Sequence, residues 1–391
     1  MQPRSLPYIV GWQQSGPSIK ACGAFITADR RPVFSGRPRS RYNRGMMELD
    51  LLLPFGLAPE ELARDLLREM CTPALSVLLA RSRRTHYQTI DGFSRALPHE
   101  IHLAQRFGLA ASAEASPGIA AALMQHFNLP ATAGAWFILQ PVHLHIARDH
   151  LVLTDPRQLS LPDDDARALF AAVQPLFEEA GSSLLYGDAQ TWVVHRDEWA
   201  ELRTSTPDAA IGHNIDIWMP KGANERDWRR MQNEVQMHWH THAVNDARDR
   251  HGHKPVNSLW LWGGASATAL PQGPYDAHFV VPGSTSPYRM LGAAKAASSA
   301  IGIIQAQPRH ALLVLDELVG LALAGAWAEW LACMQRYETL WFAPLLAALQ
   351  AGELDRINLT LSHDRALRTY TVSKSSLRAF WRKPSLARLT P

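Results

Sequence analysis

The sequence predicts an α/β fold in which helices flank a mostly parallel sheet and a separate α+β unit is inserted into the chain. Residues 311–315 form a short apolar run, residues 357–361 form a second strand-like run, and the stretch 327–349 between them has helical periodicity. Strands with few polar positions are typical of parallel sheets, which helices cover on both faces. Between residues 129 and 216 the pattern changes to short alternating runs separated by turns, which indicates a unit of its own.

Size and composition favour a large folded domain. The chain has 391 residues, of which 47% are hydrophobic and 19% charged, and it includes 13 tryptophans, so it can bury a substantial core. Its three cysteines, Cys22, Cys71 and Cys333, are odd in number and far apart, which argues against a disulfide framework or a zinc ribbon. We expect a protein of the reducing cytoplasm.

Basic residues are concentrated in the first 45 positions. This leader has a formal net charge of +7, so the rest of the chain carries −4 of the total of +3. A basic arm could bind nucleic acid or anionic lipid, but the leader has no Lys/Arg run longer than two and lacks the continuous apolar segment of a secretory signal. We expect residues 1–45 to be disordered, or to precede a natural start at Met46 or Met47.

The rest of the sequence predicts neither a membrane protein nor a nucleic-acid-binding protein. The most apolar helical stretch has no uncharged run longer than residues 318–328, and a bilayer requires roughly 20 residues. The body is acidic and has no helix-turn-helix or aromatic RNA-binding motif, which argues against nucleic acid as a partner.

The first elements of the body alternate strand and helix. Residues 48–53 predict a strand, and Pro59 then begins a helix with apolar residues on one face. A second helix is expected at residues 72–81, with the basic run 81–84 as its solvated end. A third is expected at residues 98–107, before Gly108.

The middle of the chain predicts the inserted unit. Residues 142–146 alternate apolar residues with histidines, and together with residues 151–153 they predict a hairpin. A helix at 162–177 has three aspartates in its first turn, which the helix dipole favours, and residues 191–194 predict another strand. We therefore expect a core formed by residues 46–125 and 245–391, and an inserted α+β domain at 126–244.

A histidine-rich helix is expected near the end of the inserted domain. His238 and His242 share one of its faces, a geometry in which two imidazoles can bind one metal ion. A zinc protease would need Glu beside the first histidine, where Trp239 stands, and no carboxylate or Cys completes a shell at standard spacing. We expect no metal and no other cofactor, and we retain His238 and His242 as candidate ligand-binding residues.

The other candidate ligand-binding residues are Asn245, Arg248, Asn257, Gly263 and Gly264. Residues 256–262 predict a strand that enters a glycine turn, where the backbone can approach a ligand, and Arg248 could pair with a carboxylate or a phosphate. The same residues could instead form a structural joint where the inserted unit rejoins the sheet. In that case Arg248 would lie in a buried ion pair and Asn257 would hold a turn.

Several separated motifs resemble those of bacterial regulatory proteins of the RpfE type. They are residues 233–237 (NEVQM), 255–264 (PVNSLWLWGG), 52–57 (LLPFGL), 98–100 (PHE) and 141–144 (PVHL), together with Asn245, Arg248 and Gly252. The resemblance covers the chain from about residue 46 onward. It implies a bacterial regulatory protein.

That family is distantly similar to the archaeal-type, cofactor-independent phosphoglycerate mutases of the alkaline phosphatase superfamily. The similarity implies an alkaline-phosphatase-like core, in which residues 72–80 resemble the superfamily's Thr-Pro-x-Leu helix. The chain departs from the pattern where the chemistry is expected. Its first strand has no metal-binding Asp-Gly pair, Trp262 replaces the last arginine of an Arg-Gly-Gly motif, and the nucleophile segment around Pro98 contains no Ser or Thr.

The metal ligands near the end of the chain also depart from the similarity. The superfamily's Asp-His pair appears in reverse as His363-Asp364, and Asp316 lacks the expected downstream Asp-x-x-x-His set. Asp316, His363 and Asp364 could still meet at the carboxyl edge of the sheet, but three residues are too few for a two-metal site. We therefore expect a non-catalytic regulatory protein that binds a small anionic metabolite or a protein partner. The alternative is an active metal-dependent phosphoglycerate mutase or another phosphoryl-transfer enzyme.

Overall fold

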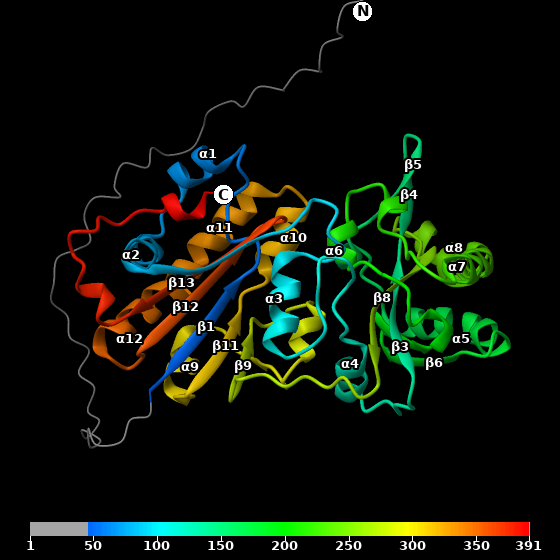
Figure 1. The fold of residues 1–391 in the computed structure, drawn as a ribbon. Coiled ribbons are helices and arrows are strands. Elements are labelled where there is room, and N and C mark those ends of the chain that lie inside the picture. The colour runs from blue at the N-terminus through cyan, green and yellow to red at the C-terminus, as the bar shows by residue number, and fades with distance from the viewer. Residues whose placement is uncertain (1–45, 391) are drawn as a thin grey trace, which may run out of the picture. The chain divides into compact units, whose positions relative to one another are not determined.

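The computed structural model describes residues 46–390 (Figure 1), so the predictions for residues 1–45 lie outside the described residues. A seven-stranded sheet has the order β10-β9-β11-β1-β12-β13-β2. β1 (Glu48–Leu53) is its central strand and lies parallel to both β11 (His310–Val314) and β12 (Arg356–Ser362). The prediction that these three strands share a mostly parallel sheet is confirmed, and with it the α/β fold class.

Short strands extend the sheet on both sides. β9 (Ala277–Val280) and β10 (Lys295–Ala296) continue the parallel part, and β13 (Ala366–Ser373) and β2 (Arg83–Thr89) follow β12 in antiparallel orientation. The expected solvated helix end at residues 81–84 is therefore wrong beyond Ser82, because Arg83 begins an edge strand. The side chains of β2 are mostly exposed, so its sequence has no alternating apolar pattern, and its structure depends on pairing with β13.

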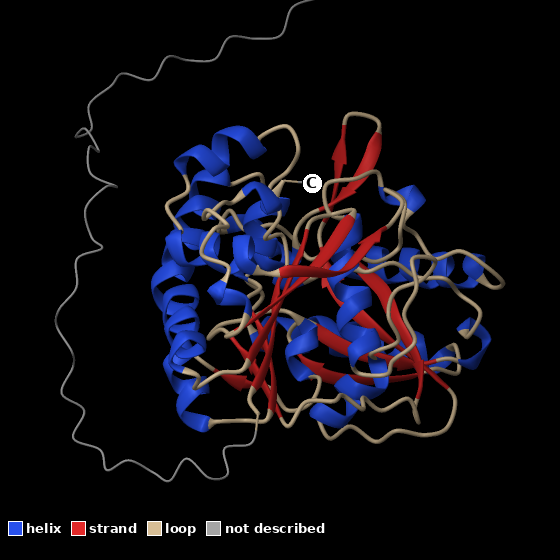
Figure 2. Ribbon diagram, turned by 60° about the vertical axis from the view of Figure 1, so that its left-hand side comes forward, coloured by secondary structure: helices blue, strands red, loops and turns tan. Residues whose placement is uncertain are grey.

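Helices cover both faces of this sheet (Figure 2). Leu49 and Leu51 of β1 are buried under one helical layer, which consists of α1 (Ala63–Glu69), α2 (Pro73–Arg81), α9 (Ala300–Ala306), α10 (Glu317–Leu323), α11 (Trp327–Tyr337) and α12 (Ala343–Ala351). Side chains alternate along a strand, so Asp50 points to the opposite face. There it accepts a hydrogen bond from Arg106, the last residue of α3 (Pro98–Arg106).

The expected helical stretch 327–349 is continuous but changes its winding. A π-helical turn at Glu338–Phe342 joins α11 to α12. The turn places the carboxylate of Glu338 against the start of α2, where it accepts hydrogen bonds from the amides of Ala74 (2.6 Å) and Leu75 (3.2 Å). A carboxylate at this end of a helix satisfies amides that have no partner within the helix, so Glu338 ties α2 to the junction of α11 and α12 within this helical layer.

The second sheet is antiparallel and has the order β6-β7-β3-β8. Its strands are β6 (Ser183–Asp188), β7 (Thr191–His195), β3 (Ala135–Val142) and β8 (Ser258–Ser266). β8 pairs with β3 although it lies beyond residue 244, so the sheet extends past the expected end of the inserted domain. The apolar pattern of β8 could not show which of two sheets it joins. We keep an inserted domain as a proposal, with its second boundary after Ser266.

The other elements of this region surround the second sheet. α5 (Asp163–Glu179), α7 (Glu225–His240) and α8 (Ala243–Arg250) pack together beside it (Figure 1), and β4 (Leu144–Ala147) pairs with β5 (His150–Leu153) in the expected hairpin. α4 (Ala120–His126) lies in the connection from β2 of the first sheet to β3 of the second, and α6 (Pro207–Ala210) lies in the long segment from β7 to β8 within the second sheet. Within residues 46–390, every helix is too short or too polar to cross a membrane.

Candidate functional site

The carboxyl edge of the parallel sheet borders a cleft of about 200 Å³, which we call the carboxyl-edge cleft. The loops after β1, β9 and β11 line it from one side, because the carboxyl ends of parallel strands meet at one edge. α3 and two segments between the sheets, around Arg157 and Asp208, line the other side. Adjoining hollows of about 40 Å³ and 400 Å³ share lining residues with it and continue toward β3 and β8.

Arg157 is held between two carboxylates at this cleft. Its Nη2 lies 2.8 Å from Oδ1 of Asp208, and its Nε lies 2.8 Å from Oδ1 of Asp155. Burial lowers the pKa of Arg157, but the two aspartates outweigh that effect and hold it above its ordinary value. The guanidinium charge is therefore permanent and is already compensated within the protein.

Glu100 is a buried acid on the first turn of α3. Its Oε2 accepts hydrogen bonds from the backbone amide of Leu97 and from the hydroxyl of Thr206, both at 2.7 Å. Burial and the neighbouring charge of Asp208 raise the pKa of Glu100 to about 8. Near neutral pH this side chain is mostly a neutral acid, which can also donate a hydrogen bond.

The free energy of unfolding should fall as the pH rises from about 5 to about 8, in part through Glu100. Across this range an unfolded glutamate has lost its proton while the folded one keeps it, so ionisation favours the unfolded state. One proton corresponds to a slope of at most about 1.4 kcal/mol per pH unit. Urea unfolding at several pH values in this range should show a shallower slope of unfolding free energy against pH for Glu100→Gln than for the wild type. Glu179→Gln, at an exposed position, should keep the wild-type slope. Equal slopes for all three proteins would mean that folded Glu100 is charged.

His99 and Tyr288 place unpaired polar atoms at the cleft. His99 is 5% exposed and Tyr288 is 3% exposed, and neither the Nδ1 of the imidazole nor the phenol oxygen has a hydrogen-bond partner. Burial lowers the pKa of His99 to about 4, so its ring is neutral, and burial keeps Tyr288 protonated by raising its pKa. Buried polar groups without partners are rare in folded proteins, and a bound molecule in the cleft would supply the missing bonds.

Asp316 and Ser284 complete the sheet side of the cleft. The Ser284 hydroxyl donates a hydrogen bond to the Asp316 carboxylate. Burial raises the pKa of Asp316, and the bond from Ser284 opposes this effect without reversing it. A carboxyl group with one bonded hydroxyl can accept a further hydrogen bond from a small ligand.

The predicted ligand-binding residues Asn245, Arg248 and Asn257 are bonded to the protein backbone. Asn245 is buried and bridges Trp239 and Val256, and Asn257 exchanges two 2.8 Å hydrogen bonds with the backbone of Leu144. Arg248 is 4% exposed and donates to the carbonyl oxygens of Lys254 and Leu159. The closest carboxylate oxygen to its guanidinium, on Asp165, is 3.9 Å away. These bonds are those of a structural joint, and ligand binding by these residues stays a prediction.

The other predicted ligand-binding residues are Gly263, Gly264, His238 and His242, and none of them lines the carboxyl-edge cleft. Gly263 has a φ of +71°, and a Cβ there would lie 2.5 Å from Ile138, while a Cβ on Gly264 would lie 2.5 Å from Phe137. Both glycines therefore allow close packing of β8 on β3. His238 is exposed, and His242 accepts a hydrogen bond from the amide of Val244 at the start of α8.

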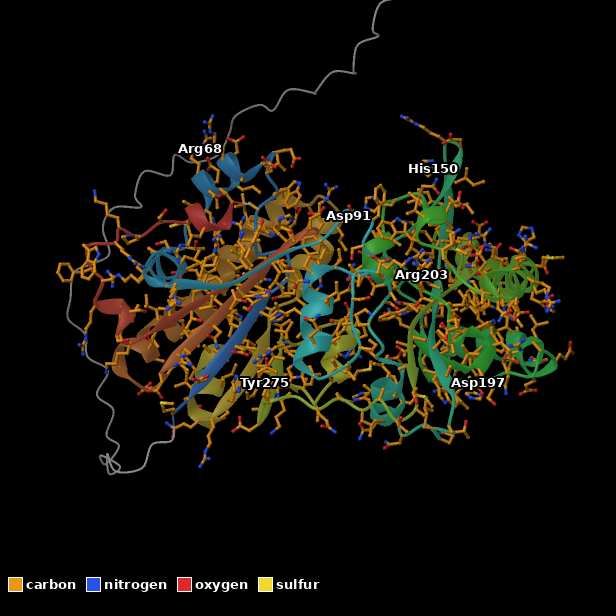
Figure 3. All side chains as sticks on the ribbon, viewed as in Figure 1. Arg68, Asp91, His150, Asp197, Arg203 and Tyr275 are labelled. Carbon is orange, nitrogen blue, oxygen red and sulfur yellow. The ribbon has the colours of Figure 1, made fainter. Side chains whose placement is uncertain are left out.

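Asp316, His363 and Asp364, which the sequence left as residues that could meet, are not among any group of metal ligands in the described part of the chain. His363 Nδ1 bonds its neighbour Asp364 at 2.6 Å, and no group of three or more His, Cys, Asp or Glu side chains among residues 46–390 could hold a metal ion. Asp50, one of the two acids of β1, lies in mid-strand. Its carboxylate is bonded by Arg106 (2.6 Å), Asn358 (2.7 Å) and Tyr275 (2.8 Å), the last labelled in Figure 3.

A wider hollow of about 860 Å³ lies between residues 110–118 and the ends of β3 and β8. Asp197 and Arg203 line it, and both are labelled in Figure 3. Its other lining residues are mostly small. Among the described side chains, none of those lining it has a buried polar atom without a partner. Despite its smaller volume, the carboxyl-edge cleft is therefore the better candidate, because of these two hollows it is the one lined by residues with buried polar atoms that have no partner.

Comparison with known proteins supports the fold and leaves the activity open. The chain is similar to the PH0037 protein from Pyrococcus horikoshii, with a TM-score of 0.50 and 11% sequence identity over 84% of this chain and 88% of that one. The cofactor-independent phosphoglycerate mutase from Thermoplasma acidophilum DSM 1728 aligns with a TM-score of 0.40 and 14% identity, over 84% and 90% of the two chains. No protein-family model matches the chain, and no curated protein matches it.

Proposed function

We propose that this chain is a non-catalytic regulatory protein, as its RpfE-type motifs suggest, and that it binds a small polar molecule in the carboxyl-edge cleft. The observation that carries the proposal is the pair of buried, unpartnered groups on His99 and Tyr288. A ligand that forms a hydrogen bond with each of these two groups would supply the partners that the protein itself does not provide, and this would favour binding. A protein partner in the reducing cytoplasm would then respond to whether the ligand is bound.

Residues for phosphoryl transfer are missing where the mutase resemblance expects them. α3 begins at Pro98 without a hydroxyl residue beside it, and the hydroxyl of the upstream Ser94 is bonded to the carbonyl oxygen of Ala96 at 2.7 Å. Gly320 stands four positions after Asp316, where the Asp-x-x-x-His pattern would place a histidine. These replacements support binding over catalysis.

The charges at the cleft favour a neutral or cationic ligand over the anionic metabolite expected from the sequence. Seven acidic residues and two arginines line the cleft and its adjoining hollows: Glu100, Asp155, Asp163, Asp188, Asp208, Asp316 and Glu317, with Arg157 and Arg289. Arg157 is already paired with two aspartates. An anion would therefore meet several acidic groups and no unpaired arginine among these lining residues, because Arg157 and Arg289 are both paired with aspartates, whereas a small alcohol or amine could bond to the acidic groups directly.

Thermal melting with small polyols and diamines, compared with inorganic phosphate and 3-phosphoglycerate, tests this proposal. The first two classes should raise the melting temperature saturably, and Tyr288→Phe should weaken the effect about three- to tenfold by removing one hydrogen bond. Tyr87→Phe, at an exposed position on β2, is the matched control. The proposal would be contradicted if only inorganic phosphate and 3-phosphoglycerate raised the melting temperature. The contradiction would be most direct if Arg157→Gln abolished that increase.

A further inference from the structure

Positive charge gathers at one edge of the seven-stranded sheet. Residues 81–90 and 365–390 contain ten Lys and Arg residues and no Asp or Glu, namely Arg81, Arg83, Arg84, Arg365, Arg368, Lys374, Arg378, Arg382, Lys383 and Arg388. The chain from residue 46 onward has a net charge of −4. The overall acidity therefore conceals a strongly basic region.

The fold joins these two segments into one surface. β2 pairs with β13, and the segment after β13, red in Figure 1, runs beside α2 and the start of β2. Arg81 donates to the carbonyl oxygen of Leu377 at 3.0 Å, and Arg382 and Arg388 both donate to that of Ser82. We call the surface formed by β2, β13 and this C-terminal segment the basic-aromatic surface.

The arginines of the basic-aromatic surface repel one another. Burial first, and then the charges of Arg382 and Arg84, lower the pKa of Arg388. Within residues 46–390, no carboxylate lies within 4.0 Å of Arg84, Arg368, Arg382 or Arg388, since none of them takes part in a salt bridge. A group of like charges without counter-ions in the protein attracts an external polyanion.

Exposed aromatic rings lie among these charges. Tyr87 on β2 is 50% exposed, and the guanidinium carbons of Arg84 and Arg368 lie 5.5 Å and 5.3 Å from its ring centre. Phe380 and Trp381 are 80% and 70% exposed, with ring centres 5.4 Å apart. A pair of large exposed aromatic side chains is unusual on a surface that binds nothing, and here two arginines lie by Tyr87 and Arg382 directly follows Trp381.

We infer that the basic-aromatic surface binds single-stranded nucleic acid. Such surfaces combine a positive track for the phosphates with aromatic rings on which bases stack, and arginine serves both purposes. An acidic peptide would explain the arginines and leave the exposed rings without a role. A membrane surface is less well matched, because Phe380 and Trp381 lie in an irregular segment and not on an amphipathic helix. The inference is independent of the carboxyl-edge cleft.

Fluorescence anisotropy of the full chain with a labelled oligothymidylate of about 12 nucleotides tests the inference. The oligonucleotide should bind, and affinity should fall steeply between about 50 and 200 mM salt. The double variant Phe380→Ala/Trp381→Ala should weaken binding at least about fivefold, because it removes two stacking rings. Arg84→Gln/Arg382→Gln should lower the slope of log affinity against log salt by about 1.4. All four side chains are exposed, so these variants should fold, which circular dichroism can verify.

Controls separate this surface from the basic leader, which is present in every variant. Arg229→Gln/Met237→Ala replaces an exposed arginine and an exposed apolar residue on α7 and should bind like the wild type. Equal affinity in all variants would place binding elsewhere and overturn the inference. The inference would also fail if binding that depends on Trp381 and Arg382 were observed only with vesicles containing phosphatidylserine, or only with polyglutamate.

Discussion

Replacing Arg248 by alanine is expected to lower the free energy of unfolding by about 3 to 5 kcal/mol. The guanidinium is 4% exposed and donates hydrogen bonds to the carbonyl oxygens of Lys254 and Leu159. The bond to Leu159 connects α8 to the segment before α5, and the bond to Lys254 holds the loop that follows α8. Alanine would leave the buried carbonyl of Leu159 without its donor and a cavity in place of the side chain, and each effect favours unfolding.

Chemical denaturation of Arg248→Ala beside Arg250→Ala measures this effect. Arg250 lies on the same helix but is exposed, so its replacement should change stability by less than about 0.5 kcal/mol. Asn257→Ala should also be destabilised, because it loses both bonds to Leu144. If Arg248→Ala kept its stability and lost a regulatory phenotype, the ligand-binding role predicted from the sequence would be supported instead.

The parallel core could be predicted because its strands have a local signal. β1, β11 and β12 are apolar runs that need burial on both faces, and helical periodicity fills the intervals between them. β2 had no such signal, since its side chains face solvent and only the partner strand β13 determines its structure. β8 is buried and was recognised as a strand, but strand pairing between distant segments decided its sheet.

The candidate site was harder to predict, because its residues come from separate segments that share no motif. Arg157, Asp208 and Tyr288 are unremarkable in the sequence and meet only in the fold. His99 and Glu100 did have a signal, as part of a short motif at the start of α3. Asn245, Arg248 and Asn257 were recognised in the sequence as readily as His99 and Glu100. In the structure they form hydrogen bonds with the backbone, and polar residues with that role cannot be distinguished in a sequence from polar residues that bind a ligand.

The purified protein should lack phosphoglycerate mutase activity, with turnover at least about 10³-fold below that of an authentic cofactor-independent mutase. Loss of the nucleophile alone or of the two-metal site alone would be enough for this decrease. Pro98 begins the helix where the hydroxyl is expected, and no group of three metal-ligating side chains forms within residues 46–390. A coupled assay with 3-phosphoglycerate and added Mn²⁺ measures the turnover.

The authentic mutase, assayed in the same buffer, shows that the conditions support catalysis, and Asp316→Asn shows whether any residual turnover belongs to this chain. A contaminating enzyme would be unaffected by that substitution, whereas a rearranged site at the carboxyl edge would lose the carboxyl group of Asp316. Turnover within about tenfold of the authentic enzyme, abolished both by a chelator and by Asp316→Asn, would contradict the non-catalytic proposal. Such a result would mean that side chains which lie apart in the free protein form a metal site around Asp316. Metal binding itself would then bring these side chains together.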